Sequence, residues 1–440
     1  MATSTLSVPA IRNRLGNLGP TWIAGAIAAG PATLASLITA GATYGYTFLW
    51  IVVLSAVAGG FAQYLSTQLG IHADAGIVSL VDRRLGRGWK WLLVADAVLA
   101  AGLAQLVIMK TVADVSATIT GIDARVWGIA WAIVLAVGLV SGGYRFAERG
   151  AKLLVSLVVV AFLASLFVVP VDPGAAIGGL VPVIPHGVSG ALLAAGILGG
   201  AVHITLVTMQ TYTVRAHGWT TDADSGIALL DVVSSMVLAF GIYSLAIFLV
   251  AGSVLHTPAI DAGSLTSTTA AKALGPLAGT NAKWLFLLGL WGAAVSTLGG
   301  NTVAPPYLVA DALGWKTDVS DGRYRALLAA VALLSAGGAF LGGSFFPLLV
   351  LVLAFGLVGT PFAIALVLYL LNDDVSSVDP STATNVGGLL LVGVTTLTAG
   401  SFVRSHLAGE ITPLNGFVAV FAFVLGVATL ALGGRYLWHG

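Results

Sequence analysis

The stretch TWIAGAIAAGPATL, residues 21–34, decides the fold. It lies inside an apolar run over 20–44, which exceeds the roughly 20 residues that a helix needs to cross a bilayer. Pro31 removes a backbone donor and clashes with the preceding turn, and Gly30 adds conformational freedom. Because the pair lies near the middle of the run, we expect the helix to break in mid-membrane. Irregular backbone at that depth is tolerated only against protein or a water-filled cavity.

The composition of the whole chain favours a membrane location. Of 440 residues, 58% are hydrophobic and 8% are charged, and the mean hydropathy is +0.99. Soluble domains carry about a quarter charged residues, so this chain lacks the polar residues for a water-facing surface. Its net charge of +1 and lack of cysteine argue against nucleic-acid binding, thiolate metal sites and cysteine nucleophiles. We expect membrane lipid as a partner and no cofactor.

Further apolar runs predict an all-α polytopic membrane protein with about twelve helices. The expected ranges are 20–44, 46–71, 90–118, 125–142, 151–171, 188–214, 225–253, 284–304, 324–342, 346–371, 385–402 and 416–436. The polar connection over 254–283 is long enough to be a mobile loop or to hold a short surface helix.

The basic residues predict the orientation of the chain in the cell membrane. If the N-terminus is cytoplasmic, the cytoplasmic segments hold Arg12, Arg14, Arg83, Arg84, Arg87, Lys90, Arg145, Arg149, Lys152, Arg215, Lys316, Arg323, Arg325 and Arg435. The opposite side holds Arg125, Lys272, Lys283 and Arg404. This bias follows the positive-inside rule. We therefore expect both termini in the cytoplasm, with residues 1–19 as a short cytoplasmic arm.

A second interruption is indicated in the sixth run, which reads GGAVHIT over residues 199–205. Two interrupted helices five spans apart are typical of inverted-repeat transporters, whose substrate site lies near the bilayer midplane. The alternative is a kinked helix that packs through small residues. The candidate helix-break residues are Gly30, Pro31, Gly199 and Gly200, and the candidate substrate-binding residues are Gly30, Thr33, Ala201, His203 and Thr205.

Several motifs in this chain resemble the Nramp divalent-metal transporters. They are Gly19-Pro20, Gly30-Pro31-Ala32-Thr33, Ala40-Gly41-Ala42-Thr43-Tyr44-Gly45-Tyr46, Gln63-Tyr64-Leu65-Ser66, Tyr144-Arg145, Glu148-Arg149, Gly179-Leu180-Val181-Pro182, and Gly196-Ile197-Leu198-Gly199. The resemblance implies the LeuT-type fold. It implies a core over 20–372 with inverted repeats of five helices each, about 20–171 and 188–371. Helices 11 and 12, within 385–440, are then peripheral.

The departures from the family pattern indicate a divergent branch. The family's Asp-Pro-Gly-Asn, whose Asp and Asn bind the metal, corresponds to Gly30-Pro31-Ala32-Thr33. The family's metal-binding Met corresponds to His203. Its two acidic residues on the proton path correspond to about Gly102 and Gln105. The resemblance therefore implies a metal transporter scaffold without its usual carboxylate, amide and thioether ligands.

The remaining polar groups within the spans are candidates for the missing roles. Thr33 and His203 are the candidate metal ligands, although imidazole suits Zn, Cu, Fe and Ni better than Mg or Ca. His203 is also a pH-sensitive group or a neutral histidine bonded across helices. Candidate coupling residues are His203, Asp96, Gln105 and Asp231; for the two acids, which could pair with Arg or line an inner vestibule, a structural role is favoured. Asn301 either faces the pathway or bridges helices.

These features favour a secondary transporter that moves a metal cation by alternating access. One alternative keeps the fold and changes the substrate to a small organic solute or a monovalent ion, because helix ends offer N–H and C=O groups to either sign of charge. Another alternative is a non-transporting membrane sensor or assembly protein. An enzyme is not expected, because no nucleophile–base pair or metal-ligand cluster stands out in the sequence.

Overall fold

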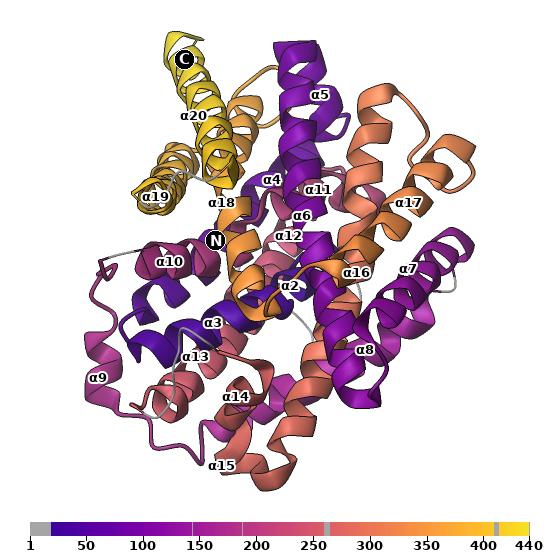
Figure 1. The fold of residues 1–440 in the computed structure, drawn as a ribbon. Coiled ribbons are helices and arrows are strands. Elements are labelled where there is room, and N and C mark those ends of the chain that lie inside the picture. Colours follow the sequence, from indigo (N-terminus) through magenta and orange to yellow (C-terminus); the bar gives the residue numbers. More distant parts are fainter. Residues whose placement is uncertain (1–18, 143, 187, 259–264, 409–412, 440) are drawn as a thin grey trace, which may run out of the picture.

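The computed structural model describes residues 19–439 except 143, 187, 259–264 and 409–412 (Figure 1). The predicted arm over 1–19 therefore lies outside the described residues, apart from Gly19. Within the described ranges the chain is helical, and the only β-type pairing is one bridge between Ala73 and Ser376. This architecture confirms the predicted all-α polytopic class.

The bounds of the helices follow the predicted spans with short additions. The first half contains α2 (Pro20–Ala28), α3 (Pro31–Tyr44), α4 (Leu49–His72), α5 (Ile77–Leu85), α6 (Arg87–Thr120), α7 (Ala124–Ser141), α8 (Tyr144–Ser165) and α9 (Pro173–Gly178). The second half contains α10 (Val188–Val202), α11 (Ile204–Ala216), α12 (Ser225–Val232), the π-helix η2 (Val233–Phe240), α13 (Gly241–Leu255), α14 (Ser267–Ala271), α15 (Gly275–Ala278), α16 (Ala282–Leu313), α17 (Gly322–Leu334), the 3-10 helix η6 (Ser335–Phe340) and α18 (Phe345–Leu371). Two further helices follow, α19 (Thr382–Leu407) and α20 (Pro413–His439).

Nine helical segments of the described chain are long and apolar enough to cross a membrane. The sequence predicts about twelve. Two of the other three predicted spans are divided by breaks in the helix. The first span is divided between α2 and α3, and the ninth between α17 and η6. In the fifth span only Lys152–Ser165 of α8 counts as a shorter apolar helix.

The first span breaks around Gly30. α2 ends at Ala28, and α3 begins at Pro31, where the missing N–H costs no hydrogen bond. Gly30 is the N-cap residue of α3 and has extended backbone, with φ −69° and ψ −179°. Two helix ends therefore meet inside one span.

The break in the sixth span lies at His203 and not at Gly199 and Gly200, which the sequence indicated. Both glycines stay inside α10, where they serve close packing. A Cβ on Gly199 would overlap the carbonyl of Leu353 on α18, and a Cβ on Gly200 would lie 2.5 Å from Thr33 Oγ1. His203 is the single non-helical residue between α10 and α11, with φ −53° and ψ 137°.

The two broken spans lie in the centre of the bundle. α10 packs against α3 and α18, and α11 packs against α2 and α4. In the most apolar 18-residue stretch of each segment, 94% of the residues are buried for α10–α11 but only 22% for α20. α19 and α20 pack on α18 at one side of the molecule (Figure 1). The centre is therefore formed by the broken spans, and the C-terminal helices are peripheral.

The short helices lie at opposite ends of the bundle. α5 and the C-terminal end of α20 lie at one end, while α9, α14 and α15 lie at the other (Figure 1). α14 and α15 belong to the polar connection over 254–283, for which a surface helix is one expectation. α5 is absent from the predicted spans, because nine residues that include Asp82, Arg83 and Arg84 are too short and too polar for a span.

Candidate substrate site

A cavity of about 40 Å³ lies where the two broken spans meet. One water needs roughly 10–15 Å³ in this measure, so the cavity holds a few water-sized groups. Its wall comes from α2, α3, α6, α10, α11, α16 and α18. The lining residues that sequence analysis singled out are Gly30, Pro31, Thr33, Gly200, His203, Thr205 and Asn301.

Two of the singled-out residues do not line this cavity. Ala201 is fully buried, and its Cβ and carbonyl lie 3.0 Å from the position that a Cβ on Gly59 of α4 would take. Gly199 faces Leu353 of α18. Both therefore serve helix packing at this level of the bundle, and the cavity side of α10 is formed by Gly200 alone.

Thr33 contributes a hydroxyl at the start of α3. Its Oγ1 donates a hydrogen bond of 2.5 Å to the carbonyl of Ala28, across the break between α2 and α3. That bond satisfies one acceptor that the break leaves without a helical partner. The lone pairs of Thr33 Oγ1 remain available at the cavity wall.

Other hydroxyls bind the carbonyls that the breaks expose. Tyr243 Oη donates to the carbonyl of Ala29 at 3.3 Å, and Thr360 Oγ1 donates to the carbonyl of Val202 at 2.9 Å. A backbone carbonyl without a partner is costly in a membrane interior. The broken backbone is therefore stabilised by side chains from α13 and α18.

His203 acts as the N-cap of α11. Its Nδ1 accepts from the backbone N–H of Thr205 at 3.4 Å and lies 2.8 Å from Thr205 Oγ1. An accepting Nδ1 assigns the proton of the neutral ring to Nε2. Nε2 has no hydrogen-bond partner in the described chain and faces Gly356 of α18, where a Cβ would overlap the ring. In this arrangement His203 offers no free nitrogen lone pair to the cavity.

The α16 side of the cavity carries two polar residues one turn apart, Thr297 and Asn301. Asn301 Nδ2 donates to the carbonyl of Ala101 at 2.8 Å and to Gln105 Oε1 at 3.0 Å. Both donors are then used, and Oδ1 is the remaining polar atom. Thr297 was missed by the sequence analysis. Its only signal was an i,i+4 relation to Asn301.

Gln105 is held in a neutral network between α6 and α16. Besides accepting from Asn301, it donates from Nε2 to Thr302 Oγ1 at 2.5 Å and to the carbonyl of Leu298 at 3.4 Å. It is not among the cavity-lining residues. The amide of Gln105 therefore joins the two helices.

The two candidate acids have different surroundings. Asp231 accepts from the backbone N–H groups of Gly19 at 3.0 Å and Thr21 at 2.8 Å, so it caps the N-terminal end of α2. Asp96 is 1% exposed, and its Oδ2 has no partner in the described chain. It faces Gly359 of α18, where a Cβ would overlap the carboxylate. Neither acid lines the cavity.

A second cavity, of about 240 Å³, extends from the first. The two share Ile27, Thr205, Leu206 and Asn301 in their walls. The second reaches Pro20 at the start of α2 and Thr213 near the end of α11. A path of cavities therefore leads from the break toward the side of the bundle on which α11 ends.

The opposite side of the break is closely packed. A separate cavity of about 150 Å³ near Thr39 and Ser189 shares no lining residue with the first. Between them, a Cβ on Gly196 would lie 3.0 Å from both Ser36 Oγ and Val350 Cγ1. The structure is closed on this side of the site.

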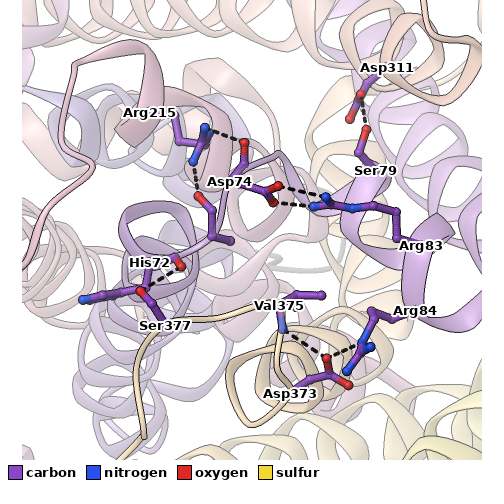
Figure 2. Close-up of polar contacts among 11 residues, drawn as sticks. His72, Asp74, Ser79, Arg83, Arg84, Arg215, Asp311, Asp373, Val375 and Ser377 are labelled. Carbon is purple, nitrogen blue, oxygen red and sulfur yellow. Dashed lines mark hydrogen bonds and ion pairs between the residues drawn. The ribbon is translucent and has the colours of Figure 1, made fainter.

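Figure 2 shows the polar contacts at the end of the bundle where α11 ends. Arg84 of α5 pairs with Asp373 in the connection after α18. Arg215 donates to the carbonyls of Ala73 and Asp74, between α4 and α5. These contacts tie the connections together on one face, called here the arginine face.

Further contacts reinforce the arginine face. Ser79 Oγ donates to Asp311 Oδ1 of α16 at 2.7 Å (Figure 2). Arg83 pairs with Asp74 and holds the pKa of that carboxyl below its ordinary value, so the pair is ionised at neutral pH. The pair is exposed and contributes little to stability. Its main effect is to position the connection between α4 and α5.

No group of three or more His, Asp or Glu side chains in the described ranges is arranged to hold a metal ion. The wall of the central cavity contains hydroxyl, amide and carbonyl oxygens and no charged side chain. A cation in this cavity would be held by neutral oxygens and by water that it retains.

Two broken spans meet at a central cavity, and a path bordered by described residues leads from it to one side, which is the arrangement of a membrane transporter of the alternating-access type. The sequence matches the model of the natural resistance-associated macrophage protein-like family, Nramp, over residues 21–405. The chain belongs to the Nramp family.

The chain is similar to the divalent metal cation transporter MntH of Mycobacterium tuberculosis, with 27% identity over 333 residues, 73% of this chain and 76% of that protein. Its fold is similar to that of a mutant of the Eremococcus coleocola manganese transporter, with a TM-score of 0.73, 14% identity, and coverage of 100% and 96%. A second fold match is Mhp1, a nucleobase-cation-symport-1 family transporter, with a TM-score of 0.56, 14% identity, and coverage of 95% and 93%. The predicted family and LeuT-type fold are confirmed.

Proposed function

We propose that this chain is a secondary transporter that moves a divalent metal cation across the cell membrane by alternating access. The observation that carries the proposal is the cavity at the crossing of the two broken spans, in a chain of the Nramp family. The relatives are named as metal cation transporters, which agrees with the expectation that the chain is not an enzyme.

The donor atoms favour a hard cation. Thr33 and Thr205 place hydroxyls on the cavity wall, and the C-terminal end of α2 directs the negative end of its dipole there. No thioether lines the cavity, and Nδ1 of His203 is engaged with the hydroxyl and the backbone N–H of Thr205, so we assign it the role of positioning Thr205. Oxygen ligands and water suit Mg²⁺, Ca²⁺ and Mn²⁺, whereas soft ligands select Cu(I) and Zn²⁺.

A monovalent cation is the second candidate substrate. A divalent ion in a region of low dielectric needs more charge compensation than a monovalent one, and the cavity wall carries no carboxylate. Retained water would reduce this difference for a divalent ion. Both classes therefore belong in the same assay.

The side of release follows from the path of cavities and the basic residues. The path leads toward the arginine face, and the positive-inside bias supports a cytoplasmic location for that face and for both termini. We propose that the cation leaves the site toward the cytoplasm in this conformation.

Asp96 is the coupling group that we propose. Among the candidate acids it alone has a carboxylate oxygen without a partner in the described chain, while Asp231 caps α2 and Gln105 is uncharged. α18, which it faces, carries no Asp, Glu, Lys, Arg or His. The nearest charge on its own helix, Lys90, binds Asp82 at 2.6 Å and the Ala312 carbonyl at 3.1 Å.

Uptake into proteoliposomes tests the proposal. Purified full-length protein should take up Mn²⁺ in a saturable manner, with competition by Mg²⁺ and Ca²⁺ stronger than by Zn²⁺. T33V should reduce uptake, and T33S, which keeps the hydroxyl, should restore it. D96N should remove any dependence on a proton gradient, and the exposed N-cap variant D123N should not.

Other outcomes would overturn the proposal. If Na⁺ or K⁺ moved and no divalent cation competed, the substrate would be monovalent. If an organic solute moved without metal competition, the solute alternative would replace the metal proposal. If no substrate moved under any gradient, a sensor or assembly function would be favoured.

A further inference from the structure

We infer that α16 supplies part of the cation site, with Thr297 and Asn301 as oxygen ligands in place of a side chain at position 30. The inference rests on the proposed function and deepens it. It assigns to α16 the oxygen ligands that position 30 of the first broken span does not supply. It also defines the substrate as a cation that keeps part of its water.

The first observation is the orientation of the Thr297 hydroxyl. The side chain lines the central cavity and is 6% exposed, and Oγ1 has no hydrogen-bond partner in the described chain. A threonine inside a helix commonly donates back to the carbonyl four residues earlier. On the same helix, Thr302 does so to Leu298 at 2.6 Å. Thr297 gives up this bond, and its hydroxyl is left at the cavity wall.

The second observation is the contact between Thr297 and Gly30. A Cβ on Gly30 would lie 2.8 Å from Thr297 Oγ1 and 3.3 Å from Thr297 Cγ2, and 2.9 Å from the carbonyl oxygen of Ile27 in the preceding turn. Real Cβ atoms do not come so close to a hydroxyl without a shift. Thr297 therefore fills the space into which a side chain at position 30 would extend. The missing side chain at Gly30 therefore leaves the space that the Thr297 hydroxyl occupies.

The third observation is the orientation of Asn301. Both hydrogens of its amide are used in bonds to Ala101 and Gln105, which directs the amide nitrogen toward α6. The carbonyl oxygen Oδ1 then remains as the acceptor of this side chain. Asn301 lines both the central cavity and the one that leads to the arginine face. It is placed to contact a cation at the site and on its way out.

Together these residues surround the cavity with neutral oxygens from two sides. Thr33 Oγ1 lies on the α3 side, against Gly200, and Thr297 Oγ1 and Asn301 Oδ1 lie on the α16 side. Residues 297 and 301 are four apart and share one helix face. Hydroxyl and amide oxygens are ligands for hard cations. The arrangement therefore fits a partly hydrated divalent cation such as Mn²⁺.

Binding of Mn²⁺ to the purified full-length chain, measured by calorimetry, tests the hydroxyl directly. T297V keeps the shape of the side chain and removes only Oγ1. We expect it to weaken binding by about tenfold, as the loss of one ligand would. T297S restores the hydroxyl and should bind more tightly than T297V. Equal affinities of T297V and wild type would overturn the inference.

A second set of variants tests whether Thr297 occupies the space that a side chain at position 30 would need. G30D alone should bind Mn²⁺ poorly and melt at a lower temperature, because its Cβ overlaps both Thr297 Oγ1 and the Ile27 carbonyl. G30D combined with T297A removes the overlap with Thr297 and leaves only the close approach to the Ile27 carbonyl, so it should bind Mn²⁺ more tightly than G30D alone. If G30D alone gained affinity without loss of stability, Thr297 would not occupy that space, and the inference would fail.

The outcome for the wild type separates this inference from the proposed function. If the wild type binds and transports Mn²⁺ while T297V and N301A match it, only the inference on α16 fails. If the wild type neither binds nor transports any divalent cation, the proposed function fails and the inference fails with it. Size-exclusion profiles and melting temperatures of every variant show whether a loss of binding reflects unfolding.

Discussion

At the scale of single residues, two glycines on α18 make room for two buried polar side chains. Gly356 faces His203, and Gly359 faces Asp96, and a Cβ at either glycine would overlap the polar group. The glycines are three residues apart and so lie on the same helix face. The close approach of α18 therefore fixes where the imidazole of the break and the unpaired carboxylate can lie.

We expect G359A to destabilise the protein by roughly 1–3 kcal/mol, the usual cost of overpacking a closed interior. G393A on the peripheral helix α19 is the matched control, because a Cβ there meets nothing within 4 Å. Thermal unfolding in detergent, followed by tryptophan fluorescence, measures both. Equal melting temperatures for the two variants would show that α18 can shift at Gly359 without a loss of stability.

The sequence could indicate some of the site residues but not all of them. Thr33, His203 and Thr205 lie beside a proline or a glycine pair in a long apolar run, so local chemistry marks them, although their roles stay predictions. Thr297 is one of several hydroxyl residues, with Ser296 and Thr302 among them, in a helix without any break. Its place at the cavity follows from the approach of α16 to Gly30, and that approach depends on packing between segments far apart in the sequence.

At the scale of elements, α2 is a short helix held by polar bonds at its N-terminal end. Asp231, within α12, binds two backbone N–H groups there, and Gln210 on α11 donates to Thr21 at 3.0 Å and to Thr67 on α4 at 2.9 Å. α2 also lines the cavity that leads to the arginine face. Movement of α2 away from α12 would widen that path.

D231A should release α2 and favour the form that is open toward the arginine face. The chain has no cysteine, so a single reporter such as A24C, which lines the path, needs no background correction. We expect A24C to react faster with a maleimide in D231A than in the Asp231 protein. D231N keeps one oxygen acceptor and should give an intermediate rate. Identical rates in all three proteins would rule out this role for Asp231.

The sequence predicted elements well where a single run decides them and poorly where contacts decide them. Pro31 marks the first break from its own covalent structure. The second break lies at His203 and not at Gly199 and Gly200, because α10 stays helical where it packs closely against α18 and α3. The π-helix η2 left no pattern in the sequence that distinguishes it from ordinary apolar helix, whereas η6 contains the pair Gly337-Gly338, from which no break was predicted.

At the scale of the whole molecule, the site is closed on one side and joined to a path on the other. Small residues on α10 pack against α18 and α3 on the closed side, while α2, α11 and α16 border the path. Contacts on the arginine face connect the loops around its exit (Figure 2). This asymmetry is the form that alternating access requires of one of its two states.

The central claim is that a metal cation binds at the crossing of the broken spans, among neutral oxygens of α3, α11 and α16. Anomalous diffraction from crystals soaked in Mn²⁺, collected at the manganese edge, tests it most directly. We predict one peak in the central cavity, within ligand distance of Thr33, Thr297 and Asn301. Saturating Mn²⁺ with no peak there, or with the main peak elsewhere in the chain, would contradict the claim.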